Sequence, residues 1–348
     1  MGATPPDRTD GRTGGRSGGR RRVPAPRRAP ASGRIPGARP GSADVSRDDL
    51  IEAVASRALS YSYRIWGFGE GLALVGILRA AQRLDRPQWI EAVADLVAPT
   101  LPRGPSTLDH LISVEALTEL DRLHPGLPVQ GAIDRFRTAI RSAERPVPDR
   151  PAVHRPDLPL LGTTVWVDCL HTDGPGLPQD EAAPLVEEVS AVLQDESGLF
   201  NHSYDVATGL TNGVHLGRGQ GWALYGLRSV RTDPAAGARL DLLTNALARH
   251  EHNGAWRTIV DDPDAPIEYS LSAMVAAGDG VRPEDPQWIA IRQRALAAAV
   301  AALDGRGGLP VSAATSVGVA RDYLERDTGV FPWGQGPLLL ALLSDDLF

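Results

Sequence analysis

The 348-residue chain contains no lysine, and its 36 Lys and Arg positions are all arginine. This absence excludes lysine Schiff bases, the attachment of pyridoxal phosphate, and the lysine of a phosphate-binding P-loop. The chain has one cysteine, Cys169, so neither an internal disulfide nor a multi-cysteine zinc site can form. A single cysteine favours a reducing compartment, and we expect a cytoplasmic protein.

Long apolar runs are also absent. No window approaches the roughly 20 apolar residues that cross a membrane as a helix, so a membrane is not an expected partner. The histidines show no spacing typical of a metal site, and there is no Gly-x-Ser-x-Gly nucleophile elbow. We therefore expect neither a bound metal nor serine-hydrolase chemistry.

Charge is distributed unevenly along the chain. Residues 1–44 hold ten arginines against three aspartates and are rich in Gly, Pro, Ala and Ser, which predicts a disordered tail. Three interpretations of this tail stay open: a mis-assigned or dispensable extension, a nonspecific anion-binding arm, and a targeting sequence. In residues 45–348, 26 arginines face 40 acidic residues, a balance of −14, so nucleic acid is not an expected partner.

A glycine-punctuated turn that runs into an apolar segment occurs three times. The copies begin at Trp66-Gly67-Phe68-Gly69-Glu70-Gly71, at Gly217-Arg218-Gly219-Gln220-Gly221-Trp222 and at Trp333-Gly334-Gln335-Gly336. Alternating glycines allow a tight turn, and a helix that follows would direct its N-terminal amides towards a ligand. Because each copy contains a tryptophan, the repetition predicts several helix N-termini gathered around one cavity.

The pattern after Asp48 is helical, with apolar residues at spacings of three and four, and no alternating run indicates a strand. Six pairs are expected, in which the first helix is amphipathic and the second is small and apolar. The expected pairs are 47–60 with 67–83, 88–98 with 107–121, 130–144 with 164–173, 180–194 with 219–231, 236–250 with 268–278, and 285–303 with 334–346. We therefore expect an all-α fold, an (α/α)6 barrel of six helical hairpins, as one catalytic domain over residues 45–348. A linear helical solenoid is the alternative, although its repeats usually keep a fixed period.

Polar and aromatic residues are concentrated in the loops that lead into the expected inner helices. Those expected to contact a substrate are Tyr63, Trp66, His202, Arg218, Gln220, Trp222 and Trp333. Such loops would meet at one mouth of the barrel, where aromatic rings stack on sugar faces and an arginine binds a carboxylate. A small carbohydrate, bound by a monomer or homodimer, is the expected partner.

Two aspartates are candidates for acid–base chemistry. Asp168 lies in the apolar segment Thr164–Leu170, where desolvation favours a protonated carboxyl group that can act as a general acid. Asp109 lies in Pro105–His110, on the neighbouring hairpin, and the two aspartates could form a carboxyl pair with different proton affinities. For each of them, capping of the following helix is the alternative role. For His202, substrate contact and an ordinary surface position both stay open.

At these motifs the chain resembles the unsaturated glucuronyl and rhamnogalacturonyl hydrolases of glycoside hydrolase families 88 and 105. The matching segments are Thr107–His110, Val165–Asp168, His202–Asp205, Gly217–Trp222, Glu268–Met274 and Trp333–Gly336. The resemblance implies an (α/α)6 barrel that needs no cofactor, with Asp168 as general acid and base and Asp109 assisting it. It also implies that His202, Arg218 and Trp222 contact an unsaturated uronic acid.

The implied reaction is the hydration of a vinyl ether. Asp168 protonates C4 of the C4=C5 double bond and then takes a proton from the water that adds at C5. The resulting hemiketal opens and releases the neighbouring sugar. The alternatives are an (α/α)6 enzyme acting on another sugar-bearing metabolite, a noncatalytic carbohydrate-binding protein, and a sugar epimerase-like barrel. In an epimerase-like barrel the active site would be centred on histidine rather than on Asp168.

Overall fold

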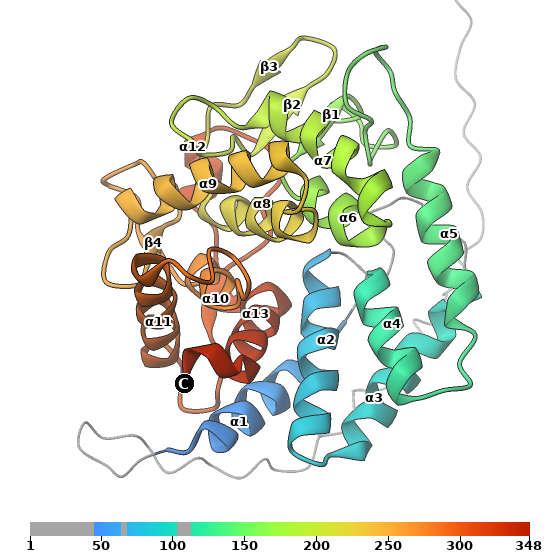
Figure 1. Cartoon of the computed structure of the whole chain (residues 1–348), viewed down its shortest axis with the longest axis vertical. Helices are drawn as coiled ribbons and strands as arrows, with labels where there is room; N and C mark the ends of the chain where they lie inside the picture. Colours follow the sequence, from blue (N-terminus) through green and yellow to red (C-terminus); the bar gives the residue numbers. More distant parts are fainter. Residues whose placement is uncertain (1–44, 64–67, 103–112) are drawn as a thin grey trace, which may run out of the picture. The chain divides into compact units, whose positions relative to one another are not determined.

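The computed structural model describes residues 45–63, 68–102 and 113–348 (Figure 1). The expected disordered tail, residues 1–44, lies outside this part, as do Trp66 and Asp109.

The described residues form helices in outer and inner pairs. The outer helices are α1 (Arg47–Leu59), α3 (Pro87–Val97), α5 (Val129–Arg141), α7 (Gln179–Leu193), α9 (Pro234–Arg249) and α11 (Pro286–Ala301). The inner helices are α2 (Phe68–Arg83), α4 (Val114–Leu123), α6 (Cys169–Gly176), α8 (Gly217–Ser229), α10 (Ser270–Ala276) and α13 (Pro332–Leu343). A short helix, α12 (Ala320–Leu324), and the 3-10 turns Ala98–Thr100 and Asp345–Leu347 complete the helical elements of this part.

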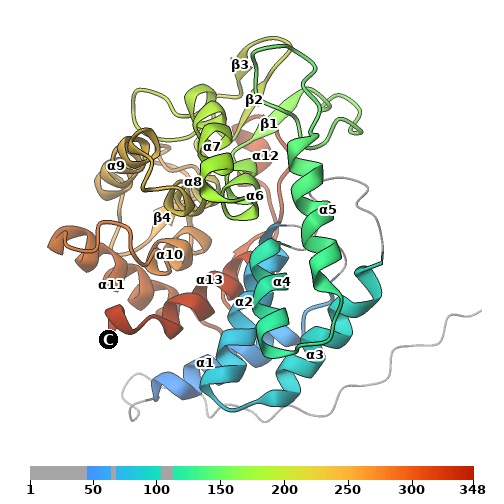
Figure 2. The same cartoon turned by 45° about the vertical axis from the view of Figure 1, so that its right-hand side comes forward.

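The six inner helices form a closed ring. Each contacts the next in the order α2, α4, α6, α8, α10 and α13, and α13 returns to α2. The outer helices pack against this ring, as the views of Figures 1 and 2 show. The contact between the first and the last inner helix excludes a linear solenoid and confirms the expected (α/α)6 barrel.

Side-chain patterns explain which helix lies outside. α5 buries Val129, Ile133, Phe136 and Ile140, a stripe at spacings of three and four, and exposes its polar face. α13 is apolar almost throughout and buries most of its residues against α2. The two backbones approach so closely that a Cβ at Gly336 would lie 2.5 Å from the backbone nitrogen of Ala73.

Short strands precede four of the inner helices, so the expectation of no strand is wrong. In the described residues they are β1 (Thr164–Trp166), β2 (Ser203–Asp205), β3 (Leu210–Thr211), β4 (Trp256–Arg257), β5 (Ile267–Glu268), β6 (Pro310–Ser312) and β7 (Thr328–Val330). They pair antiparallel as β1-β2-β3, β4-β5 and β6-β7. Each has two or three residues, which is too few to show the alternation that marks a strand in a sequence.

No helix in the described residues is long and apolar enough to cross a membrane.

Candidate active site

The β1–β2 pairing places Asp168 beside His202. Trp166 pairs with Ser203, and the N–H of Val167 donates to the carbonyl of His202 at 3.0 Å. As a result His202 Nε2 lies 3.4 Å from Asp168 Oδ2, with side chains that are 4% and 17% exposed. The Asp168 carboxyl stands at the start of α6 but makes no capping hydrogen bond to it, so the helix-capping alternative is wrong.

The opposite nitrogen of His202 meets Tyr323, a residue that the sequence analysis missed. His202 Nδ1 lies 2.6 Å from the Tyr323 hydroxyl, and the two rings meet edge to face. Burial raises the pKa of Tyr323 to about 12, although hydrogen bonds from Gly318 and Asn212 oppose the shift. The one available signal was its position, because α12 lies in the loop that leads into α13.

Arg218 occupies the first turn of α8 and is nearly buried. Its Nη1 donates to the carbonyl and hydroxyl of Ser312, at 3.1 and 2.8 Å, and its Nη2 donates to the carbonyl of Ala313 at 3.1 Å. Burial lowers the pKa of Arg218, while the carboxylates of Glu268 and Asp168 act in the opposite direction. Within the part of the chain that the structure describes, the hydrogen bonds of the Arg218 side chain all come from Nη1 and Nη2.

Trp333 forms one side of the Arg218 environment. The guanidinium lies over its ring at 5.4 Å from the centroid, and the indole Nε1 donates to the carbonyl of Ser312 at 2.9 Å. Phe331 stacks on the same indole, with centroids 4.7 Å apart. Glu268 completes the surroundings by accepting from the N–H of Ser312 at 3.1 Å. The predicted site residues Arg218 and Trp333 therefore share one anchor, Ser312.

Gln220 has a structural role in place of the predicted substrate contact. Its side chain has no exposed surface. Its Oε1 accepts from the N–H of Phe200, and its Nε2 donates to the carbonyls of Phe200 and Leu216, at 2.8, 2.8 and 3.1 Å. The amide therefore ties α8 to the loop that follows α7.

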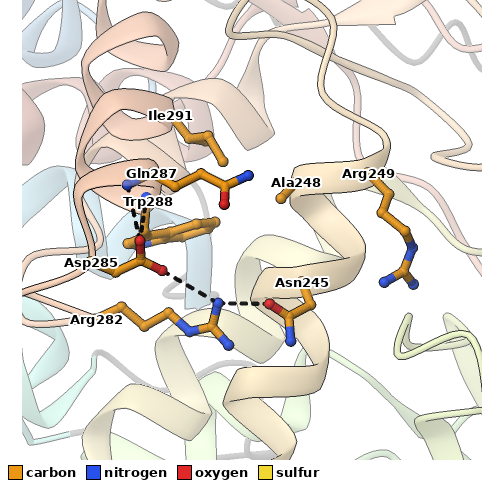
Figure 3. A pocket seen from close by; sticks show the side chains of 8 residues that line it. All are labelled: Asn245, Ala248, Arg249, Arg282, Asp285, Gln287, Trp288 and Ile291. Atoms are coloured by element: carbon orange, nitrogen blue, oxygen red, sulfur yellow. Dashed lines mark hydrogen bonds and ion pairs between the residues drawn. The ribbon is translucent and has the colours of Figure 1, made fainter.

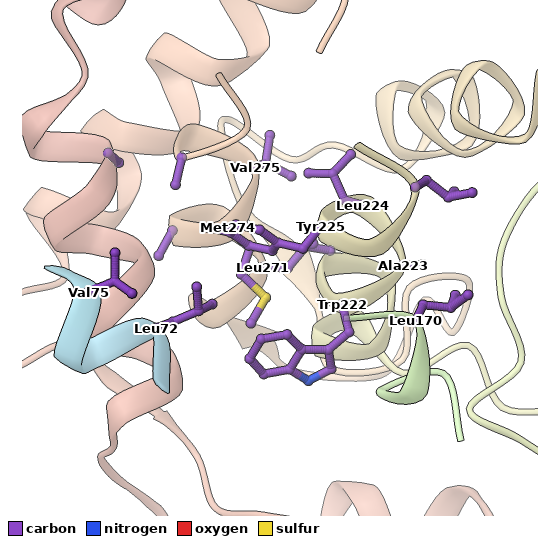
Figure 4. Close-up of a cluster of buried hydrophobic side chains, with 14 of the residues drawn as sticks. Leu72, Val75, Leu170, Trp222, Ala223, Leu224, Tyr225, Leu271, Met274 and Val275 are labelled. Carbon is purple, nitrogen blue, oxygen red and sulfur yellow. The ribbon is translucent and has the colours of Figure 1, made fainter. Parts of the chain in front are cut away.

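Trp222 is also fully buried. Its indole stacks on His171, with centroids 5.1 Å apart, and lies beside Met274 in the apolar cluster of Figure 4. One indole face is therefore occupied by His171, and the described arrangement gives Trp222 a packing role within the barrel rather than the predicted open sugar platform.

Tyr63 is half-buried and donates its hydroxyl to the carbonyl of Ala58 at 3.2 Å. Burial, together with the Glu70 carboxylate, raises its pKa. The predictions for Trp66 and Asp109 fall outside the described residues.

A second polar cluster lies behind α6. His154 Nε2 is 3.0 Å from Asp173 Oδ1, and both side chains are buried close to Cys169. Burial alone would lower the pKa of His154, but the Asp173 carboxylate and Cys169 raise it well above its usual range. Cys169 itself is a small buried residue.

One pocket of the outer layer lies between α9 and α11 (Figure 3). Asp285 accepts from two N–H groups that begin α11, and Arg282 donates to Asn245 Oδ1 at 2.8 Å. These polar groups join the two outer helices, so this pocket is separate from the cluster around Asp168. No group of three His, Cys, Asp or Glu residues in the described ranges could hold a metal ion.

No family model matches the chain. Over 173 residues it is 32% identical to the unsaturated rhamnogalacturonyl hydrolase YesR of Bacillus subtilis (strain 168). This match covers 45% of the chain and 48% of YesR, so it spans about half the length of that relative.

Solved structures show the same fold. A family 105 glycoside hydrolase of C. acetobutylicum ATCC 824 is 19% identical, with a TM-score of 0.71, covering 85% of this chain and 98% of that one. The unsaturated glucuronyl hydrolase of Bacillus sp. GL1, responsible for glycosaminoglycan degradation, is 17% identical, with a TM-score of 0.68 and coverages of 85% and 94%. Sequence and fold together confirm the resemblance to glycoside hydrolase families 88 and 105.

Proposed function

We propose that the chain is a cytoplasmic glycoside hydrolase that acts on oligosaccharides with an unsaturated uronic acid at one end. The observation that carries the proposal is the position of the Asp168 carboxyl group. It makes no capping hydrogen bond to α6, is partly exposed, and lies 3.4 Å from the buried His202. The similarity to YesR, an unsaturated rhamnogalacturonyl hydrolase, supports the substrate class.

Asp168 acts in both directions in the proposed reaction. Its protonated carboxyl gives a proton to C4 of the C4=C5 double bond, and positive charge develops at C5 and the ring oxygen. Water adds at C5 and returns a proton to the carboxylate, which restores the acid. The hemiketal then opens to a ketone and releases the neighbouring sugar as an alcohol. Asp109 assists this exchange.

The residues near Asp168 have different roles in the proposed substrate binding. His202 contacts one oxygen of the Asp168 carboxyl group, so that the other oxygen faces the substrate. The Nε–Nη2 edge of Arg218 matches a carboxylate, because two parallel N–H groups can bind its two oxygens. The bonds from Arg218 to Ser312 and Ala313 fix that edge, and Trp333 supports the guanidinium from one face.

The test is incubation with a panel of disaccharides made by polysaccharide lyases. Loss of the ultraviolet absorbance of the double bond, together with release of the second sugar, is the expected result. Asp168→Asn protein serves as the control for contaminating hydrolases. Binding of these disaccharides without loss of absorbance would favour the noncatalytic carbohydrate-binding alternative. The absence of both binding and turnover would contradict the proposal.

A further inference from the structure

We propose that Tyr323 is a positioning residue that fixes the tautomer of His202, so that an N–H group at Nε2 faces Asp168. The catalytic consequence rests on the proposed function, whereas the tautomer is a property of the resting protein.

The orientation of the Asn212 amide is determined by backbone groups. Its Oδ1 lies 3.3 and 3.4 Å from the N–H groups of Ser203 and Val214, which can only donate. Its Nδ2 lies 3.1 Å from the carbonyl of Gly318, which can only accept. A flipped amide would oppose like groups at all three contacts. The nitrogen of Asn212 is therefore the atom that faces the Tyr323 hydroxyl, at 2.9 Å.

The Tyr323 hydroxyl consequently accepts two hydrogen bonds. One comes from Asn212 Nδ2, and the other comes from the N–H of Gly318 at 3.3 Å. A phenol has two acceptor positions and one proton, so its proton is directed to the remaining neighbour. That neighbour is His202 Nδ1 at 2.6 Å. The raised pKa of Tyr323, about 12, keeps this proton on the hydroxyl at neutral pH.

The histidine ring then has one arrangement. Nδ1 accepts from Tyr323, so the ring proton of a neutral imidazole is at Nε2. Nε2 is the atom that lies 3.4 Å from Asp168 Oδ2. With the proton there, the Nε2–H group faces Asp168 Oδ2 as a donor, and the acidic proton of the protonated carboxyl group lies on Oδ1, the oxygen that faces the substrate in the proposed reaction. In the other tautomer the Nε2 lone pair would draw that proton to Oδ2 and away from the substrate.

The surroundings hold Tyr323 in place. Its ring packs in a small apolar cluster with Val214, Leu216, Ile259 and Ala265, and it is 1% exposed. The backbone of His202 is fixed independently, because its N–H donates to the carbonyl of Val214 at 2.8 Å. Both partners of the 2.6 Å contact are therefore anchored before a substrate arrives.

The experiment measures the tautomer directly. In protein labelled with ¹⁵N at the histidine rings, long-range ¹H–¹⁵N correlation spectra distinguish a protonated ring nitrogen from a bare one. The His202 signals are assigned by their absence from His202→Gln protein. Wild-type protein is expected to show a bare Nδ1 and a protonated Nε2 at His202. Tyr323→Phe is expected to increase the Nδ1-protonated form and to lower kcat about tenfold, the effect of losing an orienting partner, with little change in KM.

Two further variants make the result specific. Tyr204→Phe removes a buried hydroxyl from the neighbouring strand, where it contacts Arg150, and should leave the His202 spectrum and the rate unchanged. Asn212→Asp offers Tyr323 an alternative acceptor, so it should shift the tautomer even if Tyr323→Phe fails to fold. The assignment would be overturned by an unprotonated Nε2 in wild-type protein, or by an unaltered His202 spectrum in both Tyr323→Phe and Asn212→Asp. A changed tautomer with an unchanged kcat would overturn the positioning role. The expected tautomer in a protein that consumes no disaccharide would support the assignment and count against the proposed function.

Discussion

The turns that begin α8 and α13 share the sequence Gly-Gln-Gly, and each turn has one residue in the candidate site and one that supports the barrel. Gly217–Gly221 aligns with Pro332–Gly336, so that Gln220 corresponds to Gln335. Both glutamines are fully buried. Gln335 repeats the role of Gln220: its Oε1 accepts from the N–H of Leu309 at 2.7 Å, and its Nε2 donates to the carbonyl of Gly307 at 2.9 Å.

The residues two positions earlier, Arg218 and Trp333, also correspond, and they do something different. They meet each other, with the guanidinium over the indole, and both donate to the carbonyl of Ser312. Residues two apart on a helix project about 200° apart, since each residue turns the helix by about 100°. The motif therefore supplies one residue to the candidate site and one to the frame of the barrel.

This difference predicts that substitutions in the candidate site change the kinetics, and that substitutions of the two buried glutamines change the stability of the fold. The largest effect is expected for Asp168→Asn, because Asn keeps the shape of the side chain but cannot transfer the proton. General acid–base catalysis contributes about 10²–10⁴-fold, and this group acts twice, so the rate on a lyase-generated disaccharide should fall by the upper end of that range. Near-normal rates, with an unchanged thermal unfolding curve, would remove Asp168 from the chemistry.

Arg218→Lys should have the next largest kinetic effect. The ammonium keeps the charge but loses the flat N–H edge, and a hydrogen bond to a charged group is worth roughly 1.5–3 kcal/mol, so kcat/KM for uronyl substrates should fall about 10- to 100-fold. The matched control is the methyl ester of the same disaccharide. The ester should be turned over at similar rates by both proteins, and an equal loss on acid and ester would assign Arg218 to the frame.

Gln220→Met and Gln335→Met test the frame. Methionine fills a similar volume but leaves the N–H and carbonyl groups of the clamped loop without their partner, so each variant should lose about 1–3 kcal/mol of unfolding free energy. Urea unfolding measures the loss. Because neither amide faces the substrate in this arrangement, the folded variants should keep kcat/KM. A kinetic defect in Gln220→Met alone would restore the substrate contact predicted from the sequence.

Trp333→Phe should have the smallest effect. It removes the indole N–H that donates to Ser312 but keeps an aromatic ring beneath Arg218, so the expected loss of stability is about 1 kcal/mol. Thermal unfolding measures this loss, and kcat/KM should change by only a fewfold. A loss of activity as large as that of Arg218→Lys would indicate direct contact between the indole and the sugar.

The helical frame was predictable because long amphipathic segments show their period in the sequence. The expected helix 180–194 is α7, Gln179–Leu193, and the expected 285–303 is α11, Pro286–Ala301. The segment 164–173 was assigned entirely to a helix, but α6 begins only at Cys169. Thr164–Trp166 forms a strand instead, because it pairs with residues about forty positions later, and a local pattern contains no information about that partner.

The chemistry of the site was less predictable than its location. Asp168 and His202 lie in segments that lead into inner helices, whereas Arg218 and Trp333 lie in the first turns of α8 and α13, and a rule based on position predicted all four as site residues. The same rule assigned Gln220 to the site, because a sequence of polar residues does not show which way each one points. It passed over Tyr323, whose importance comes from three hydrogen-bond partners that lie up to 121 residues away.

Closure of the ring has a consequence for synthesis on the ribosome. α13 contacts both α2 and α10, and Arg47 at the start of α1 reaches Asp345, 298 residues later. The barrel therefore stays open until Pro332–Leu343 has been made, and loops of this length close slowly. Until then the apolar faces of α2 and α10 are exposed, which is the state that chaperones recognise. Ribosome-bound chains of increasing length should become resistant to protease only after α13 has emerged, and earlier protection would show that an open ring is already stable.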